Sequence, residues 1–167
     1  IKTYSGNNRN MESPSIPDEG VSAELNKFNN TEKEYDLSNP LHKLFELQVN
    51  RTPDNIALKF EGLTLTYNEL NCLANQLAYK LIDSGVKPDS LVAVYMERSV
   101  EMIVALYAIL KAGGAYLPLN PELPEERINF IIKDADPVII LSQNHLSGVL
   151  SNCQKPVIEI DNRFDMI

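Results

Sequence analysis

Residues 110–128, which read LKAGGAYLPLNPELPEERI, decide the fold that we predict for this chain. Lys111 places a cation in the last turn of a helix, and Gly113 and Gly114 can adopt the left-handed conformation that ends it. The apolar residues 115–119 then predict a short strand, and the proline-containing segment after them predicts an extended turn. Paired glutamates open the next helix. The stretch therefore predicts a helix, a strand and a second helix joined by tight turns.

Upstream of this stretch, residues 65–70 (LTYNEL) carry a second local signal. Apolar and polar residues alternate over 56–61 and 63–66 around Gly62, which predicts a β-hairpin. Thr66 and Glu69 then form a T-x-x-E capping box that begins a helix. We expect this helix to end at Gly85 and to bury one apolar stripe, made of Leu70, Leu73, Ala74, Leu77, Ala78, Leu81 and Ile82.

The rest of the chain alternates strands with amphipathic helices. Asn39 and Pro40 predict a cap and a first helical residue, and Ser99 predicts a second cap. We expect the helix after Ser99 to bury Met102, Ile103, Leu106, Ile109 and Leu110. The remaining expected elements are strands at 91–96, 138–141 and 157–160, a helix at 124–135 and a weak helix at 145–151. This order predicts an α/β fold, a mostly parallel sheet with helices on both faces and an N-terminal β-hairpin.

Residues 1–39 differ in composition from the rest. They are rich in Asn, Ser, Glu and Pro, and their few apolar residues show no period, so we expect a largely irregular linker. Leu25, Phe28 and Tyr35 are its candidates for contact with a neighbouring domain. Residues 40–167 form the expected globular part.

Composition excludes several classes of function. The formal net charge of −8 argues against non-specific binding to nucleic acid or anionic lipid. The sequence contains neither an apolar run long enough to span a membrane nor a secretion signal, so we expect a cytoplasmic protein. Cys72 and Cys153 lack metal-ligand spacing, and we expect inert thiols and no metal site.

The two motifs together closely resemble the first two sequence motifs of the adenylation domains of non-ribosomal peptide synthetases, members of the adenylate-forming superfamily. The resemblance runs from about Leu41 to the end of the sequence, and residues 25–35 resemble the linker that follows a condensation domain. Asn120 and Leu123 depart from the usual pattern, in which an aspartate and an aromatic residue are common. The positions that carry the resemblance are Leu65, Thr66, Tyr67, Glu69, Leu70, Leu110, Lys111, Ala112, Gly113, Gly114, Tyr116, Pro118, Pro121, Glu126 and Arg127.

The resemblance implies the N-terminal portion of a large domain that continues beyond residue 167. It also implies an activity: an amino acid is activated by ATP as an aminoacyl-adenylate, with Mg²⁺, and is then passed to the phosphopantetheine thiol of a carrier domain. The partners implied are the amino acid and the carrier and condensation domains of the same synthetase.

Residues with catalytic potential are few in this sequence. It contains no GxxxxGK[ST], GxGxxG or SGTTG-type phosphate loop, and Gly113-Gly114 follows a helix rather than opening one. His42 and His145 show no nucleophile or carboxylate arrangement typical of a triad. We therefore expect the motif residues to form the fold, no catalytic or cofactor-binding residue within this chain, and no ligase activity from it alone.

Two alternatives remain open from the sequence. One is a stand-alone acyl-CoA or aryl-acid ligase of the same superfamily. The other is a non-catalytic α/β interaction module that uses this layer as a docking platform.

Overall fold

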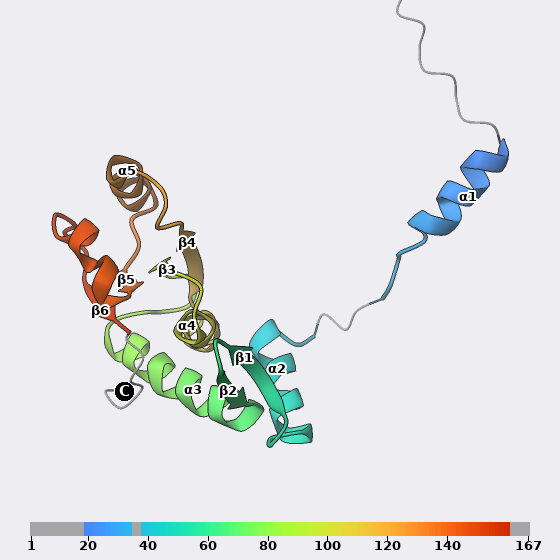
Figure 1. The fold of residues 1–167 in the computed structure, drawn as a ribbon, viewed down its shortest axis with the longest axis horizontal. Coiled ribbons are helices and arrows are strands. Elements are labelled where there is room, and N and C mark those ends of the chain that lie inside the picture. The colour runs from blue at the N-terminus through green and yellow to red at the C-terminus, as the bar shows by residue number, and fades with distance from the viewer. Residues whose placement is uncertain (1–18, 35–37, 161–167) are drawn as a thin grey trace, which may run out of the picture. The chain divides into compact units, whose positions relative to one another are not determined.

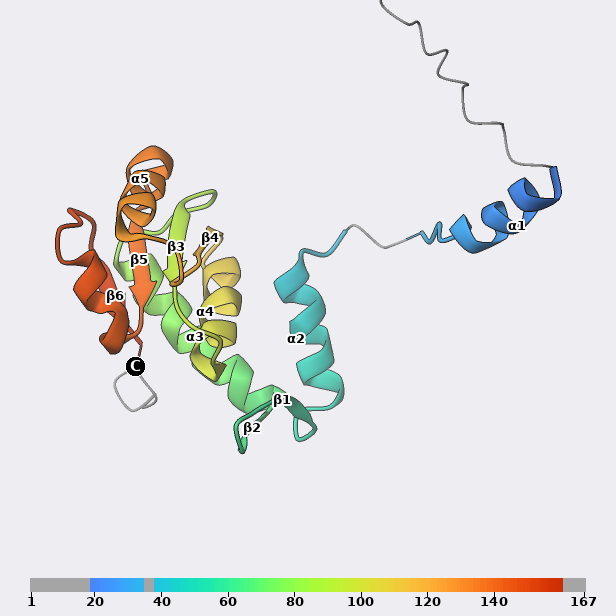
Figure 2. The ribbon, with the colours of Figure 1, turned by 45° about the horizontal axis from the view of Figure 1, so that its top comes forward.

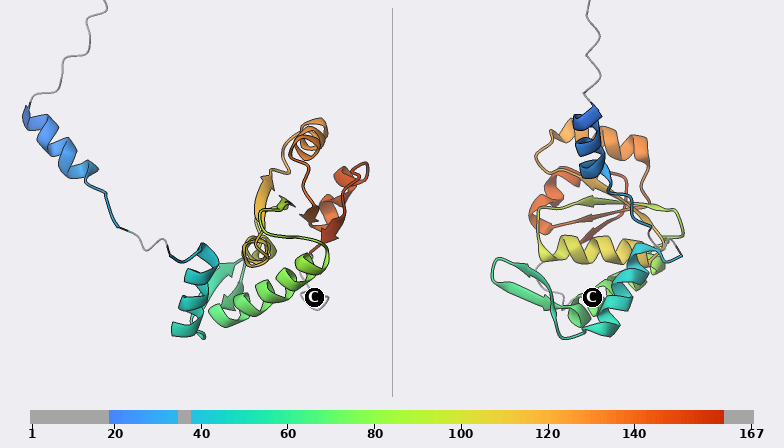
Figure 3. Two further views of the ribbon diagram at one scale, coloured as in Figure 1. Left: turned by 180° about the vertical axis from the view of Figure 1, so that it is seen from behind. Right: turned by 90° about the vertical axis from the view of Figure 1, so that its right-hand side faces the viewer.

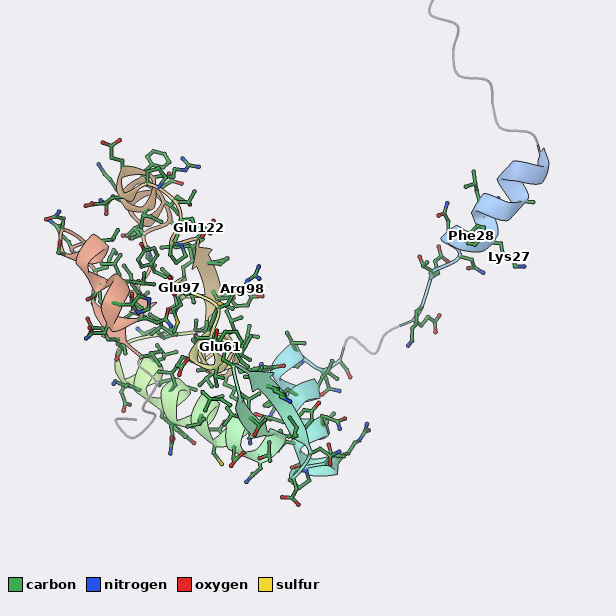
Figure 4. The ribbon with its side chains drawn as sticks, in the orientation of Figure 1. Lys27, Phe28, Glu61, Glu97, Arg98 and Glu122 are labelled. Carbon is green, nitrogen blue, oxygen red and sulfur yellow. The ribbon has the colours of Figure 1, made fainter. Side chains whose placement is uncertain are left out.

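The computed structural model describes residues 19–34 and 38–160, and the chain divides into two compact units, Ile1–Leu37 and Ser38–Ile167. In the first unit, helix α1 spans Glu19–Asn29, and its Leu25 and Phe28 side chains are exposed; Phe28 is labelled in Figure 4. These residues of the expected linker are therefore helical. The Glu, Ala, Leu and Lys residues of α1 favour helix, and Lys27 in the last turn faces the negative end of the helix dipole. Tyr35 lies outside the described residues.

The second unit is built on a parallel sheet. Its strands are β3 (Leu91–Tyr95), β4 (Ala115–Leu119), β5 (Ile139–Ser142) and β6 (Val157–Glu159), in the order β4-β3-β5-β6. Every neighbouring pair in this sheet is parallel. The central strand β3 is buried from Val92 to Tyr95, as its continuous apolar run predicts.

Helices cover both faces of this sheet, which confirms the predicted α/β fold (Figures 1 and 3). Helices α3 (Tyr67–Asp83) and α4 (Val100–Lys111) share a core with Val92 and Val94. Helix α5 (Glu125–Ala135) and the 3₁₀ helix η1 (Asn144–Leu150) share the opposite core with Ala93 and Tyr95. Because successive side chains of a strand point to opposite faces of the sheet, alternate residues of β3 pack into the two cores and stabilise the helices on both faces.

The β-hairpin and helix α2 pack beside α3 and α4 (Figure 2). Helix α2 spans Leu41–Arg51, and strands β1 (Ile56–Phe60) and β2 (Leu63–Thr66) pair antiparallel. Glu61 and Gly62 form their turn with φ values of 45° and 86°. Positive φ at both central residues is typical of the tight turns that match strand twist, so the predicted hairpin is confirmed.

The buried faces of two helices differ from expectation. In α4 the buried residues are Val100, Glu101, Val104, Ala105, Ala108 and Ile109, whereas Met102, Ile103, Leu106 and Leu110 are only partly buried. The reason is that α4 packs along α3 as well as against the sheet, so its small residues lie in the close contact and its longer ones reach the rim. In α3 the predicted stripe holds except at Leu73, which is partly buried, and at Ile82, which is 47% exposed.

Element boundaries shift by one or two residues from those predicted. Pro40, not Asn39, occupies the cap position of α2, without a side-chain cap hydrogen bond. Ser99 caps α4 as predicted, accepting a hydrogen bond from the Met102 N–H at 3.1 Å. The weak helix expected at 145–151 is the 3₁₀ helix η1. No helix in the part of the chain that the structure describes is long and apolar enough to cross a membrane.

Candidate functional site

The first motif builds the junction between the hairpin and α3. The Thr66 hydroxyl oxygen accepts a hydrogen bond from the Glu69 N–H at 3.2 Å, and the Glu69 carboxylate accepts one from the Thr66 N–H at 2.8 Å. The hydrogen bonds that the Glu69 carboxylate accepts, first from the Thr66 backbone and then from its hydroxyl, lower the pKa of Glu69. Leu70 is buried in the core and Tyr67 packs against it. The predicted capping box is therefore confirmed.

Lys111 of the second motif is buried and paired. Its side chain is 5% exposed, and its Nζ lies 2.6 Å from the Glu46 carboxylate on α2. Glu46 also pairs with Lys43 at 2.7 Å, and the hydrogen bond from Lys111, followed by that from Lys43, lowers the Glu46 pKa to about 2. Lys111 Nζ also lies 6.0 Å from the centre of the Phe45 ring. The motif lysine thus joins the end of α4 to α2, in addition to facing the negative end of its own helix.

A cavity of about 330 Å³ adjoins this ion pair. Sequence reasoning expected no catalytic arrangement at His42, and the structure places that residue in the cavity lining with Lys43 and Glu46. The other lining residues are Asn75, Ala78, Tyr79, Ile82 and Lys111.

The paired glycines of the second motif have different roles. Gly113 has φ +82°, the left-handed conformation predicted for the helix end. Gly114 has no positive φ, but a Cβ there would lie 3.1 Å from the Ser90 carbonyl oxygen and 3.2 Å from Val86. Gly114 is therefore required for the close approach of the chain to the segment before β3, not for the cap.

The remaining motif residues form the exposed end of the stretch. Tyr116, Pro118, Glu126 and Arg127 are exposed, and Pro121 is partly buried. Pro118 lies on β4, which pairs only with β3 among the described strands. The N–H that proline lacks therefore removes no hydrogen bond between described strands.

Two further contacts shape this exposed end. The Asn120 side-chain oxygen accepts a hydrogen bond from the Glu122 N–H at 3.1 Å, so this asparagine closes the turn. The guanidinium carbon of Arg127 lies 5.2 Å from the centre of the Phe130 ring.

The carboxyl end of the sheet carries a polar cluster that sequence reasoning missed. Strand β4, which follows β3 in the sequence, lies on one side of β3, and β5, which follows β4, lies on the other side. The order of the strands in the sheet therefore reverses between β3 and β5. Crevices at such reversals, outside the carboxyl ends of the strands, are where open α/β sheets bind ligands. The polar residues that directly follow the predicted strands were the feature of the sequence that could have indicated this cluster.

Glu97 is the centre of this cluster (Figure 4). Its N–H donates a hydrogen bond to the Gln143 side-chain oxygen at 2.8 Å, and its carboxylate lies 3.4 Å from His145 Nε2. Both side chains of the latter pair are more than half exposed. Tyr95, two residues before Glu97, is buried, and burial, then the Glu125 charge, raises its pKa. The cluster places the His145 imidazole beside the Glu97 carboxylate, just after the carboxyl end of β3.

The cysteines take no part in either arrangement. Cys72 and Cys153 are free; Cys72 is exposed, and Cys153 lines a cavity of about 500 Å³. Within residues 19–34 and 38–160, no group of three or more His, Cys, Asp or Glu side chains is placed to hold a metal ion.

Comparison with known proteins identifies relatives of this chain. The chain is 52% identical to a mycosubtilin synthase of Bacillus subtilis over 126 residues, which cover 74% of this chain and 5% of that protein. It is 48% identical to gramicidin S synthase 2 of Brevibacillus brevis over 124 residues, which cover 74% of this chain and 3% of that protein. The chain therefore spans only a small part of the length of the relatives that it matches.

Solved structures agree in fold. The crystal structure of the nonribosomal peptide synthetase FmoA3 is similar with a TM-score of 0.75 and 36% identity, over 86% of this chain and 16% of that one. The N-terminal subdomain of Klebsiella oxytoca NpsA, in complex with 3-hydroxyanthranilyl-AMSN, gives a TM-score of 0.65 and 26% identity, over 71% of this chain and 30% of that one. The family model described as AMP-binding enzyme matches residues 45–165, which is most of the chain. This chain therefore belongs to the AMP-binding enzyme family.

Proposed function

We propose that this chain supplies the first α/β layer of an adenylation domain in a cytoplasmic non-ribosomal peptide synthetase. The observation that carries the proposal is the identity of 52% and 48% to two peptide synthases over about three quarters of the chain. Both motifs that carry the resemblance fall inside the matched residues 45–165.

The proposed reaction has two steps. The carboxylate of an amino acid attacks the α-phosphorus of ATP, forming an acyl–phosphate bond while the bond to pyrophosphate breaks. A carrier-domain phosphopantetheine thiol then attacks the acyl carbon, forming a thioester and releasing AMP, and the thiol proton passes to solvent or a base. Condensation domains of the same synthetase are the proposed next users of the thioester.

The residues of this chain act in this proposal as a scaffold. The capping box at Thr66 fixes the start of α3, and the Lys111–Glu46 pair fixes α2 against the end of α4. Among the described residues, no group of three or more acidic, imidazole or thiol side chains is placed to hold a metal ion. We therefore derive no step through the metal, and we assign the groups that contact the phosphates to other parts of the polypeptide.

The test is amino-acid-dependent exchange of labelled pyrophosphate into ATP by the intact protein that contains this sequence. We expect exchange with one amino acid, or a few related ones, from a panel of the proteinogenic set. The chain of residues 1–167 alone is expected to give none, and exchange by it would overturn the assignment of a scaffold role. Absence of exchange by the intact protein with every acid tested would favour a non-catalytic interaction module.

A second candidate is activation of an aryl acid. It is favoured by the similarity to NpsA, whose N-terminal subdomain was solved with 3-hydroxyanthranilyl-AMSN. The identity of 26% to NpsA is well below that to the peptide synthases, so amino-acid activation ranks first. Adding benzoate and anthranilate derivatives to the exchange panel separates the two.

A further inference from the structure

The cavity of about 330 Å³ beside the Lys111–Glu46 pair has a lining that the scaffold role leaves unexplained. Helix α2 contributes His42, Lys43 and Glu46 to this lining, and Lys111 comes from the last turn of α4. Helix α3 contributes an amide side chain and a short apolar surface. Three helices of the globular unit therefore bring polar and charged side chains to one hollow, which has the size of a small-molecule site.

Several hydrogen-bond donors of this lining have no acceptor in the described part of the chain. The side chains of His42, Asn75 and Tyr79 make no hydrogen bond with another described residue. The buried Lys111 ammonium carries three N–H donors, and among the described residues its one hydrogen-bond acceptor is Glu46. The lining thus presents N–H and O–H donors to an acceptor group placed in the cavity.

The lining carries a net charge of one positive unit when histidine is counted as neutral. Lys43 and Lys111 are cations, and Glu46, whose pKa is about 2, stays ionised at neutral pH. This local sign is opposite to the net charge of −8 of the whole chain. One additional negative charge would neutralise the lining, whereas a divalent anion would leave an excess of negative charge beside the Glu46 carboxylate.

The α3 wall of the cavity is apolar. Ala78 is buried, and Tyr79 and Ile82 are 72% and 47% exposed. Sites for small molecules combine apolar and aromatic walls of this kind with a few polar groups that fix the orientation of the ligand. The cavity therefore suits a ligand that has an acidic head group and an apolar body.

We propose that this cavity binds a small organic monocarboxylate, whose carboxylate lies against Lys43, Lys111 and Asn75 and whose apolar body lies against Tyr79 and Ile82. Hydrogen bonds between an ammonium and a carboxylate are among the strongest in proteins. Burial of Lys111 strengthens its share of the attraction, because solvent and salt screen a buried charge less than an exposed one. This site does not depend on the reaction proposed above.

The test is acetylation of lysines by acetic anhydride in the intact protein that contains this sequence, measured by mass spectrometry. Benzoate is the probe, titrated to about 20 mM, because a ligand of this size can bind as weakly as the millimolar range. Bound benzoate should shield Lys43, whose side chain is 55% exposed, and slow its acetylation by at least about fivefold at the top of the titration. Lys87 is exposed outside the cavity lining and should react at an unchanged rate.

Two further probes separate charge from shape. Benzamide keeps the ring and a planar head group but has no charge, and inorganic phosphate is charged but has no apolar body. We expect each of them to slow the acetylation of Lys43 by less than about 1.5-fold at the same concentration. Equal shielding by benzamide would overturn the role of the cations. Equal shielding by phosphate would overturn the assignment to a monocarboxylate with an apolar body.

Variants of the lining locate the bound benzoate. The benzoate concentration that gives half-maximal shielding of Lys43 should rise by about three- to tenfold in Asn75→Ala and by more than about tenfold in Lys111→Met. Asn68→Ala, at an exposed asparagine of the same helix outside the lining, is the control and should leave it unchanged. Asn75→Ala keeps the test decisive if Lys111→Met fails to fold. The proposal is wrong if benzoate does not shield Lys43 in the parent protein, or if Asn75→Ala shields it as the parent does.

Discussion

Lys111 on α4 and Glu46 on α2 stand 65 positions apart in sequence, and their side chains meet at 2.6 Å. Because the Lys111 side chain is only 5% exposed, this ion pair is shielded from solvent on the lysine side. It joins the second motif to the first helix of the globular unit, and it accompanies the stacking of Phe45 on Tyr107, whose ring centres lie 4.2 Å apart. The motif lysine thus has a tertiary role that its position at a helix end does not reveal.

Replacing Lys111 by methionine should destabilise the chain by about 1–2 kcal/mol, because Glu46 loses its buried partner while the aliphatic packing is kept. The matched control is Lys43→Met, which removes the other lysine bound to Glu46 but at a side chain that is 55% exposed. We expect that control to cost less than about 1 kcal/mol. Urea unfolding followed by circular dichroism measures both, and equal losses would show that burial of Lys111 does not matter.

The same pair predicts a pH dependence. The Glu46 pKa falls from 4.5 to about 2 on folding, so its stabilising contribution is complete above pH 4.5 and is lost as the pH falls through 2. The shift corresponds to at most about 3 kcal/mol, and solvent screening of the 30% exposed carboxylate reduces this to about 1–2 kcal/mol. The difference in unfolding free energy between the parent chain and Glu46→Gln should therefore shrink between pH 4.5 and 2. A constant difference over that range would contradict the assignment.

Gly114→Ala should destabilise the chain by about 1–3 kcal/mol, because the new methyl group would crowd the Ser90 carbonyl oxygen at 3.1 Å and Ile109 at 3.3 Å. Gly148→Ala is the control, since nothing lies within 4 Å of a Cβ at that position. We expect the control to be neutral within about 0.5 kcal/mol. Thermal unfolding distinguishes the two variants. If Gly114→Ala left the stability unchanged, the backbone before β3 would be able to shift and accommodate the methyl group at little cost.

Thr66→Ala removes the hydroxyl that accepts the Glu69 N–H and should cost about 1 kcal/mol. Asn68→Ala, two positions on, changes an exposed residue in the same first turn and serves as the control, with an expected change under about 0.5 kcal/mol. Amide hydrogen exchange should show faster exchange at Glu69 only in the first variant. Unaltered protection there would argue that the helix start is fixed by tertiary packing instead.

His145→Ala should leave the stability of the chain within about 0.5 kcal/mol, because the imidazole and its partner Glu97 are both more than half exposed. In the intact protein we also expect the pyrophosphate exchange rate to change by less than about threefold, since we assign no reacting group to this chain. A loss of about a hundredfold or more would make the cluster around Glu97 part of the catalytic site.

Local chemistry determined the elements whose signals lie within a few residues of one another. The T-x-x-E box, the Ser99 cap, the hairpin at Glu61-Gly62 and the helix end at Gly113 all appear where the sequence predicts them. In each, the side chain or glycine acts on a backbone group in the same turn. The parallel sheet also followed from the sequence, because continuous apolar runs between amphipathic helices permit few other arrangements.

Tertiary structure alone decided which groups meet across the sequence. Hydrophobic periodicity shows that α4 has a buried face, but whether that face contains Met102 or Glu101 depends on α3 packing beside it. The partner of Lys111 and the tight contact at Gly114 likewise come from segments brought close by folding. Pairings of this kind depend on three-dimensional proximity, and a sequence pattern reports only the neighbours along the chain.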